Sequence, residues 1–182
     1  MKRIILVLLI ICGVILVSCQ HVRDVKNIDP HSVGALSREY DRRLADELMP
    51  KIAKAIVESD TKTLKSLFSP YVIETQPDLE KDIMALFLAF EGEIVSYEKK
   101  NAEKMAASAS YGQYTFKTTE FGYRTVETST GKVYSILVYY TVVNDENPDE
   151  VGLTKIFIYD INDLNVPIAR AGDFPLPQRP LL

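Results

Sequence analysis

Cysteine and histidine carry most nucleophilic, redox and zinc chemistry in proteins, and in this 182-residue sequence they occur only near the start. The chain has two of each: Cys12, Cys19, His21 and His31. From Ser32 onward neither type occurs, which argues against Ser–His and Cys–His catalysis, zinc sites of the usual ligand types and thiol redox chemistry. Chemistry in the rest of the chain would have to use Asp, Glu, Tyr, Lys, Arg or Ser. We predict no catalytic residue, no metal and no cofactor.

Tyrosine is the most suggestive of the remaining residue types. Ten are present, and six fall on expected strands: Tyr97, Tyr123, Tyr134, Tyr139, Tyr140 and Tyr159. An inward tyrosine gives a pocket an apolar wall with a hydroxyl group, although aromatic residues also favour strands through packing alone. We predict ligand contacts at Tyr97, Tyr139 and Tyr159. Asp160 does not pair with Tyr159 as an isomerase site would require, because neighbours on a strand point to opposite faces.

Two charged segments contain residue types that could bind ions. Residues 145–150 carry oxygen-bearing side chains at alternate positions, as calcium loops do. An EF-hand would need Gly and Glu at the positions that Glu150 and Ile156 occupy here, so we predict a solvated hairpin loop. Lys99 and Lys100 are predicted to be an exposed strand end rather than an anion site.

The first residues show the three zones of a secretory signal. Lys2 and Arg3 supply positive charge, and Ile4 to Val17 is an apolar run of 14 residues, counting Gly13. A membrane-spanning helix needs about 20 apolar residues. The run therefore suits a cleaved signal better than a permanent anchor.

The run ends in Leu16-Val17-Ser18-Cys19, which resembles the lipobox of bacterial lipoproteins. The resemblance implies a diacylglyceryl group on Cys19, with acyl chains such as palmitate, and removal of residues 1–18. Two acyl chains hold a protein firmly on a bilayer. We expect an extracytoplasmic protein anchored to the cell membrane by this lipid, with an uncleaved signal anchor as the alternative. The envelope type, Gram-positive or Gram-negative, stays open.

Composition limits the mature chain to one domain. Residues 19–31 are predicted to be the lipidated cysteine and a polar tether, and residues 32–182 a single domain with an irregular C-terminal tail. Removing Lys2 and Arg3 leaves 19 basic and 25 acidic residues, a net charge of −6. This acidic balance, without a basic stripe, argues against a nucleic-acid partner. Acylation of Cys19 leaves no thiol for a disulfide.

The first half of the domain has helical periodicity. Apolar residues recur every four positions in two adjacent rows, Leu36, Tyr40, Leu44, Leu48, Ile52 and Ile56 beside Ala45, Met49, Ala53 and Val57. This pattern predicts a helix over residues 32–59, kinked or divided at Pro50. Further helices are expected over 61–68 and 78–91, with a short extended piece over 71–75 between them.

The second half has the two-residue period of strands. Strands are expected over 93–99, 114–129, 132–144 and 151–161, with a loop over 101–112. In the third strand, both faces are apolar, so both should be covered. Helices can cover one face, and the other needs a partner subunit, the tail or a lined cavity. The order predicts an α+β fold, with N-terminal helices packed on a curved antiparallel sheet of about four strands.

Several blocks of sequence carry a family resemblance: Leu64 to Ser69, Phe90 to Tyr97, Tyr139-Tyr140-Thr141, Asn147-Pro148 and Val151-Gly152-Leu153. Together they resemble an uncharacterised family of lipoproteins from Gram-positive bacteria, a domain-of-unknown-function family. That family is similar to the nuclear-transport-factor-2-like superfamily, with its cystatin-like cone of helices wrapped by a curved sheet. The resemblance implies a pocket inside the cone and often a dimer formed through the sheet.

Three hypotheses for function follow. The first is a membrane-anchored, non-catalytic domain that binds a small apolar ligand or a protein partner. The second is a pocket enzyme of isomerase or cyclase type that uses Tyr and a carboxylate. The third is a structural module that forms a homodimer through the sheet face.

Overall fold

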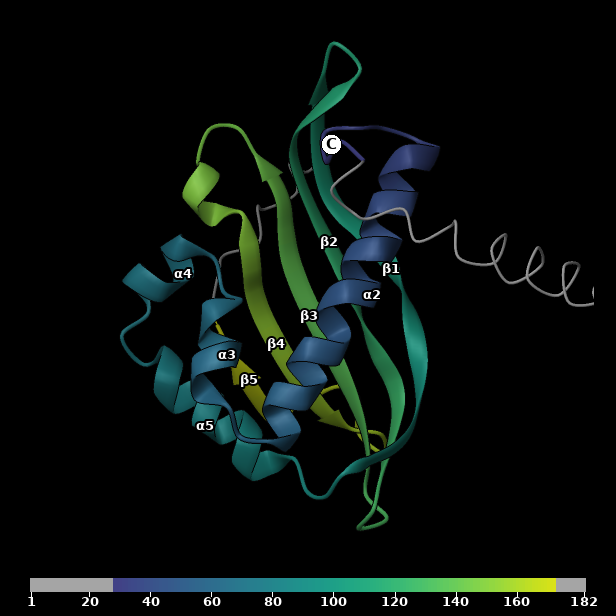
Figure 1. Cartoon of the computed structure of the whole chain (residues 1–182), viewed down its shortest axis with the longest axis vertical. Helices are drawn as coiled ribbons and strands as arrows, with labels where there is room; N and C mark the ends of the chain where they lie inside the picture. Colours follow the sequence, from purple (N-terminus) through teal and green to yellow (C-terminus); the bar gives the residue numbers. More distant parts are fainter. Residues whose placement is uncertain (1–27, 173–182) are drawn as a thin grey trace, which may run out of the picture.

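The structure of the protein, a computed structural model, describes residues 28–172. The predicted signal peptide, Cys19, His21 and most of the predicted tether lie outside the described residues, as does the end of the C-terminal tail. Helices come first in the described part and are followed by one antiparallel sheet (Figure 1). The predicted α+β class is therefore confirmed.

The helices are α2 (Ala35–Val57), α3 (Thr61–Ser66), α4 (Pro70–Thr75) and α5 (Leu79–Ala89). Pro50 lies inside α2 without dividing it. The short extended piece predicted over 71–75 was wrong, because this segment is α4. Pro70 occupies the first helical position, and the hydroxyl of Ser69 accepts a hydrogen bond from the Val72 amide at 3.3 Å, so the helix has a good start. No helix in residues 28–172 is long and apolar enough to cross a membrane.

The sheet contains β1 (Ile94–Ser110), β2 (Gln113–Thr128), β3 (Val133–Asn144), β4 (Gly152–Asp160) and β5 (Ala169–Ala171) in that order. All neighbouring strands are antiparallel. The sheet has one strand more than the predicted four. The additional strand, β5, is only three residues long and pairs with β4 in a region that was predicted to be irregular.

Strand β1 is much longer than predicted. The loop expected over 101–112 was wrong, since β1 pairs with β2 as far as Ser110 opposite Gln113. Tyr111 and Gly112 form the turn with φ values of 49° and 77°, the left-handed geometry that two-residue hairpin turns favour. The pairing with β2 thus imposes a strand on small residues that have little strand preference of their own.

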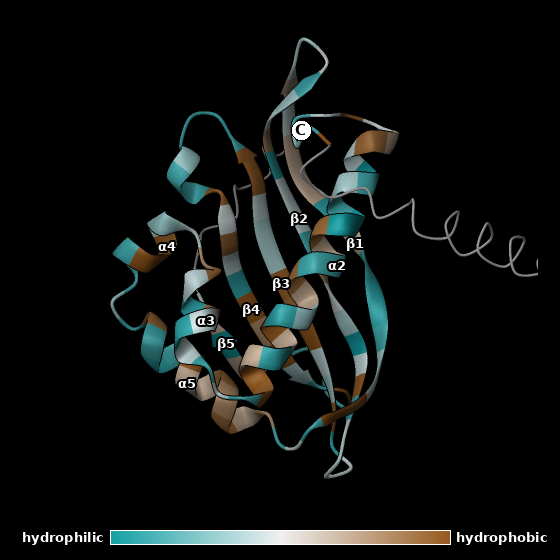
Figure 2. Cartoon of the chain, viewed as in Figure 1, coloured by the Kyte–Doolittle hydropathy of each residue, from teal (hydrophilic) through white to brown (hydrophobic). Residues whose placement is uncertain are grey.

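The helices cover one face of the sheet. Figure 1 shows α2 crossing the first three strands, with α3, α4 and α5 beside β4 and β5. Hydrophobic residues gather where the end of α2, α5 and the central strands meet (Figure 2). The space between is packed with fully buried side chains, including Ile52, Leu64, Ile83, Leu86, Phe121, Ile136, Ile156 and Ile158. The pocket that the family resemblance implies inside the cone is thus occupied by side chains at its centre.

The start of α2 differs from its predicted apolar row. Leu36 is 59% exposed, whereas Ser37 and Asp41 are buried and meet Lys117 of β2. Counting back by fours from Ala45 in the second predicted row gives Asp41 and then Ser37. The inward stripe of α2 therefore continues as polar residues, because a buried lysine lies opposite.

Candidate ligand site between α2 and the first two strands

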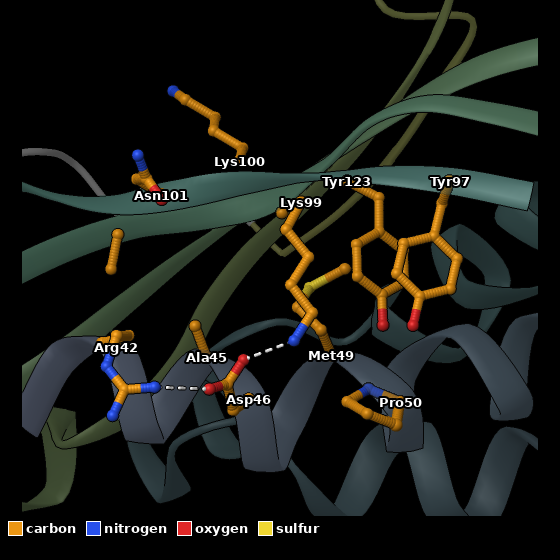
Figure 3. A pocket seen from close by; sticks show the side chains of 12 residues that line it. Arg42, Ala45, Asp46, Met49, Pro50, Tyr97, Lys99, Lys100, Asn101 and Tyr123 are labelled. Carbon is orange, nitrogen blue, oxygen red and sulfur yellow. Dashed lines mark hydrogen bonds and ion pairs between the residues drawn. The ribbon is translucent and has the colours of Figure 1, made fainter.

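An open cleft lies between α2 and the strands β1 and β2, with a volume of about 220 Å³. Figure 3 shows its lining side chains. Helix α2 contributes Arg42, Ala45, Asp46, Met49 and Pro50, and the strands contribute Tyr97, Lys99, Lys100, Asn101, Ala102, Gly122 and Tyr123. Lys99 lies opposite Tyr123 in the register of β1 and β2, so the bulged pairing of these strands sets the geometry of the cleft.

Two stacked tyrosines form one end of the cleft. The rings of Tyr97 and Tyr123 are 3.9 Å apart between centroids, with an interplanar angle of 20°. Tyr97 is 45% exposed and covers Tyr123, which is only 3% exposed. Burial, followed by hydrogen bonding with Tyr97, raises the pKa of the Tyr123 hydroxyl. Both hydroxyl groups point toward α2 near Pro50 (Figure 3), and Tyr97 is the more exposed of the two residues.

The charged groups of the cleft compensate one another. Lys99 Nζ donates to one oxygen of Asp46 at 2.7 Å, and Arg42 donates to the other at 3.1 Å (Figure 3). The contact with Asp46 raises the pKa of the Lys99 ammonium. Arg42 and Arg43 also hold the pKa of Glu39 at about 2. The charged groups beside α2 are therefore paired with one another.

This arrangement engages Asp46, the one carboxylate among the described residues that line the cleft. A carboxylate that acts as a general base must reach the proton of its substrate. Both oxygens of Asp46 already accept hydrogen bonds from cations. Within residues 28–172 there is also no group of three or more His, Cys, Asp or Glu side chains that could hold a metal ion. The cleft offers an aromatic face, hydroxyl groups and an apolar floor at Met49.

The three tyrosines predicted to contact a ligand do not lie together. Tyr97 lines the cleft on the helix side of the sheet. Tyr139 and Tyr159 lie on the opposite face, where each packs against Phe157 with ring centroids 5.6 and 6.0 Å apart. Burial raises the pKa of both hydroxyls, and for Tyr139 the neighbouring Tyr159 adds to the shift.

Lys99 and Lys100 are not the exposed strand end that was predicted. Both lie in the middle of β1 and point to opposite faces of the sheet (Figure 3). The Lys100 side chain is only 13% exposed and forms an ion pair with Glu120, whose side chain is 8% exposed. The prediction failed because β1 continues past these residues.

Asp46, Arg42 and Tyr123 are site residues that sequence reasoning did not select. The sequence placed Asp46 and Arg42 on a helix and Tyr123 on a strand, but not opposite one another. Only the packing of α2 on the sheet brings them together, and no motif in the sequence marks this contact. The acidic loop over 145–150 is exposed between β3 and β4, as predicted.

Comparison with known families identifies the chain without assigning it an activity. Residues 51–163, more than half of the chain, match the family described as Domain of unknown function (DUF5104). The match contains α3, α4, α5 and strands β1 to β4 entirely, together with the end of α2. A search of curated proteins found no match. The chain therefore belongs to the DUF5104 family.

Proposed function

We propose that the mature protein is an extracytoplasmic lipoprotein, held on the cell membrane through lipid on Cys19, whose domain binds a small ligand without converting it. The signal-like N-terminus and the sequence Leu16-Val17-Ser18-Cys19 support the anchor. The resemblance to lipoproteins of Gram-positive bacteria agrees with it. Four helices against one face of a curved sheet support the cone fold of nuclear-transport-factor-2-like proteins.

The stacked pair of Tyr97 and Tyr123 is the observation that carries the binding proposal. The outer face of Tyr97 remains nearly half exposed at the mouth of the cleft, where a flat molecule can stack on it. A volume of about 220 Å³ is below the usual range for drug-sized ligands, so we expect a compound of one or two small rings. Because the charged groups of the cleft are paired with one another, the hydroxyl group of Tyr97 is left to form the hydrogen bond that orients the ligand.

Indole is a suitable probe for this site. The chain contains ten tyrosines but no tryptophan, so indole fluorescence can be excited selectively at wavelengths longer than those that tyrosine absorbs. The full chain in phosphatidylcholine nanodiscs should shift and quench the indole emission. Tyr97→Ala should abolish this change, whereas Tyr111→Ala, which removes a fully exposed tyrosine at the β1–β2 turn, should leave it intact. Equal binding by the two variants would refute the assignment of the cleft.

The anchor is tested by the intact mass of the chain extracted from membranes of a bacterium that processes it. The expected mass begins at Cys19 and includes a diacylglyceryl group. Cys19→Ser should give an uncut chain without lipid. A wild-type chain that keeps residues 1–18 would favour the signal anchor instead.

A pocket enzyme of isomerase or cyclase type is the second candidate, because Asp46 and two tyrosine hydroxyls share the cleft. The engagement of Asp46 by Arg42 and Lys99 weighs against it. Turnover of a compound that Asp46→Asn abolishes would favour the enzyme over the binding domain. A dimer formed through the sheet face, the third hypothesis, predicts a concentration-dependent mass in sedimentation.

A further inference from the structure

The face of the sheet opposite the helices carries a row of half-buried apolar side chains on β3 and β4. The row consists of Leu137, Tyr139, Phe157 and Tyr159, with Leu137 directly opposite Phe157 in the register. Tyr139 meets Phe157 edge-on at 82°, and Tyr159 lies against its other side. In the described part of the chain, no helix covers this row.

A hollow of about 420 Å³ lies at one end of this row. Its surface is mainly apolar, and its lining includes three hydroxyl side chains and two cations: Lys100, Arg124, Thr125, Ser135, Leu137, Tyr159, Ile161 and Leu164. Leu164 is 55% exposed, which leaves one apolar wall open to solvent. Volume and lining fall in the range of small-molecule sites.

Among the described residues, the polar groups of the hollow already have partners, except for the guanidinium of Arg124 and the hydroxyl of Tyr159. Lys100 is paired with Glu120. The Ser135 hydroxyl donates to the carbonyl oxygen of Tyr123 at 3.3 Å, and the Thr125 hydroxyl donates to Glu98 at 3.4 Å. Among residues 28–172, the exposed guanidinium of Arg124 forms no hydrogen bond or ion pair, and no acidic residue lines the hollow itself. Arg124 is therefore the one cation of the hollow without an ion-pair partner in the described part of the chain.

We propose that this hollow binds a single-chain amphipathic carboxylate, with Arg124 as the counter-ion of the carboxylate and Leu137, Tyr159 and Leu164 in contact with the alkyl chain. A guanidinium matches a carboxylate in geometry and can bind it through two parallel hydrogen bonds. One free positive charge matches a monoanion better than a doubly charged phosphate. An organic cation would meet Arg124 with like charge, and a neutral chain would leave the guanidinium without a partner.

This site is separate from the cleft between α2 and β1. Lys100 borders both sites, but its ammonium forms an ion pair with Glu120. This ion pair lies on the opposite face of the sheet from Tyr97 and Tyr123 (Figure 3). The proposal therefore stands whether or not the cleft binds a ligand.

Octanoate, octanol and octyltrimethylammonium are matched probes for titration calorimetry with the full chain in phosphatidylcholine nanodiscs. Uptake of a given probe into the lipid is the same for every variant, so a difference between variants reports binding of that probe to the protein. The wild-type chain should bind octanoate and prefer it to the other two. Arg124→Gln should weaken octanoate binding at least about tenfold, which is the scale of a lost hydrogen bond to a charged group.

Arg170→Gln is the matched control, because Arg170 lies on the same face opposite Phe157 but does not line the hollow. It should change octanoate binding by less than about twofold, as expected for a screened surface charge. Leu137→Gln should weaken binding of octanoate and octanol together. Equal loss in Arg124→Gln and Arg170→Gln, or a preference for octanol, would overturn the proposal. So would a wild-type chain that binds no probe because a second copy or residues 173–182 cover the face.

Discussion

The ammonium of Lys117 on β2 lies 2.5 Å from a carboxylate oxygen of Asp41 on α2, and both residues are buried. Ser37 accepts a second hydrogen bond from Lys117 at 2.7 Å, and the rings of Tyr40 and Tyr114 lie over the cation at 5.8 and 5.5 Å. Burial raises the pKa of the Asp41 carboxyl, and the contact with Lys117 opposes that shift. This polar contact fixes α2 on the sheet next to the cleft.

Removing one member of this pair should be strongly destabilising. Lys117→Met leaves Asp41 buried without its counter-charge, and losses of about 3–5 kcal/mol are typical of such changes. The double variant Asp41→Leu with Lys117→Met should recover most of the loss, because no uncompensated charge remains. Urea unfolding followed by circular dichroism measures both. Lys99→Met, which breaks an exposed pair with Asp46, should cost less than about 1 kcal/mol.

Gly122 should not tolerate a side chain. A Cβ at this position would overlap the carbonyl oxygen of Ile136 on the neighbouring strand. Gly122→Ala should therefore cost about 3 kcal/mol, the upper end of the range for overpacking. Gly131→Ala serves as the control, because its Cβ meets nothing within 4 Å and only the positive φ of 79° is unfavourable, at about 1 kcal/mol. Equal losses in urea unfolding would contradict this explanation.

The sequence alone predicted the elements whose own apolar residues follow a clear pattern. The apolar rows of α2 and the run of apolar residues in β3 predicted a helix and a strand, and both are present. The second half of β1 was missed because Ala and Ser have little strand preference, and the partner strand β2 supplies the reason for the conformation. Helix α4 could have been predicted from its Ser69-Pro70 start, since serine is a common N-cap and proline suits the first helical position.

The candidate sites were harder to predict than the fold. Tyr97 was predicted to contact a ligand, and it lines the cleft. Two other residues of the cleft, Tyr123 and Asp46, are 26 residues after it and 51 before it in sequence. Their position in the same cleft depends on the strand register and on where α2 crosses the sheet. Neither quantity follows from a local pattern of residues.

The contact between residues 28–31 and the domain should weaken at high pH. His31 lies between Asp29 at 3.0 Å and Asp145 at 3.1 Å, and the hydrogen bond with Asp145 is the main cause of its raised pKa. A raised histidine pKa stabilises the folded contact below about pH 6.5, and this contribution is lost as the pH rises through the folded-state value.

Amide exchange at Tyr114 can report this change, because its N–H donates to the carbonyl oxygen of His31 at 2.8 Å. The protection factor, which corrects for the intrinsic pH dependence of exchange, should fall between pH 6 and pH 9. In His31→Gln it should be lower at pH 6 and nearly independent of pH. A wild-type protection factor that rises with pH would rule out the proposed role of His31.

The central claim is that the cleft beside Tyr97 binds a ligand without converting it. The most direct measurement is a titration of the isotope-labelled full chain in nanodiscs with indole, followed by two-dimensional NMR of the backbone amides and by the spectrum of indole itself. We predict shifts concentrated around Asp46, Tyr97 and Tyr123, while the indole signals show no new product. Shifts that avoid these residues, or a product that forms with the wild-type chain and not with Asp46→Asn, would contradict the account.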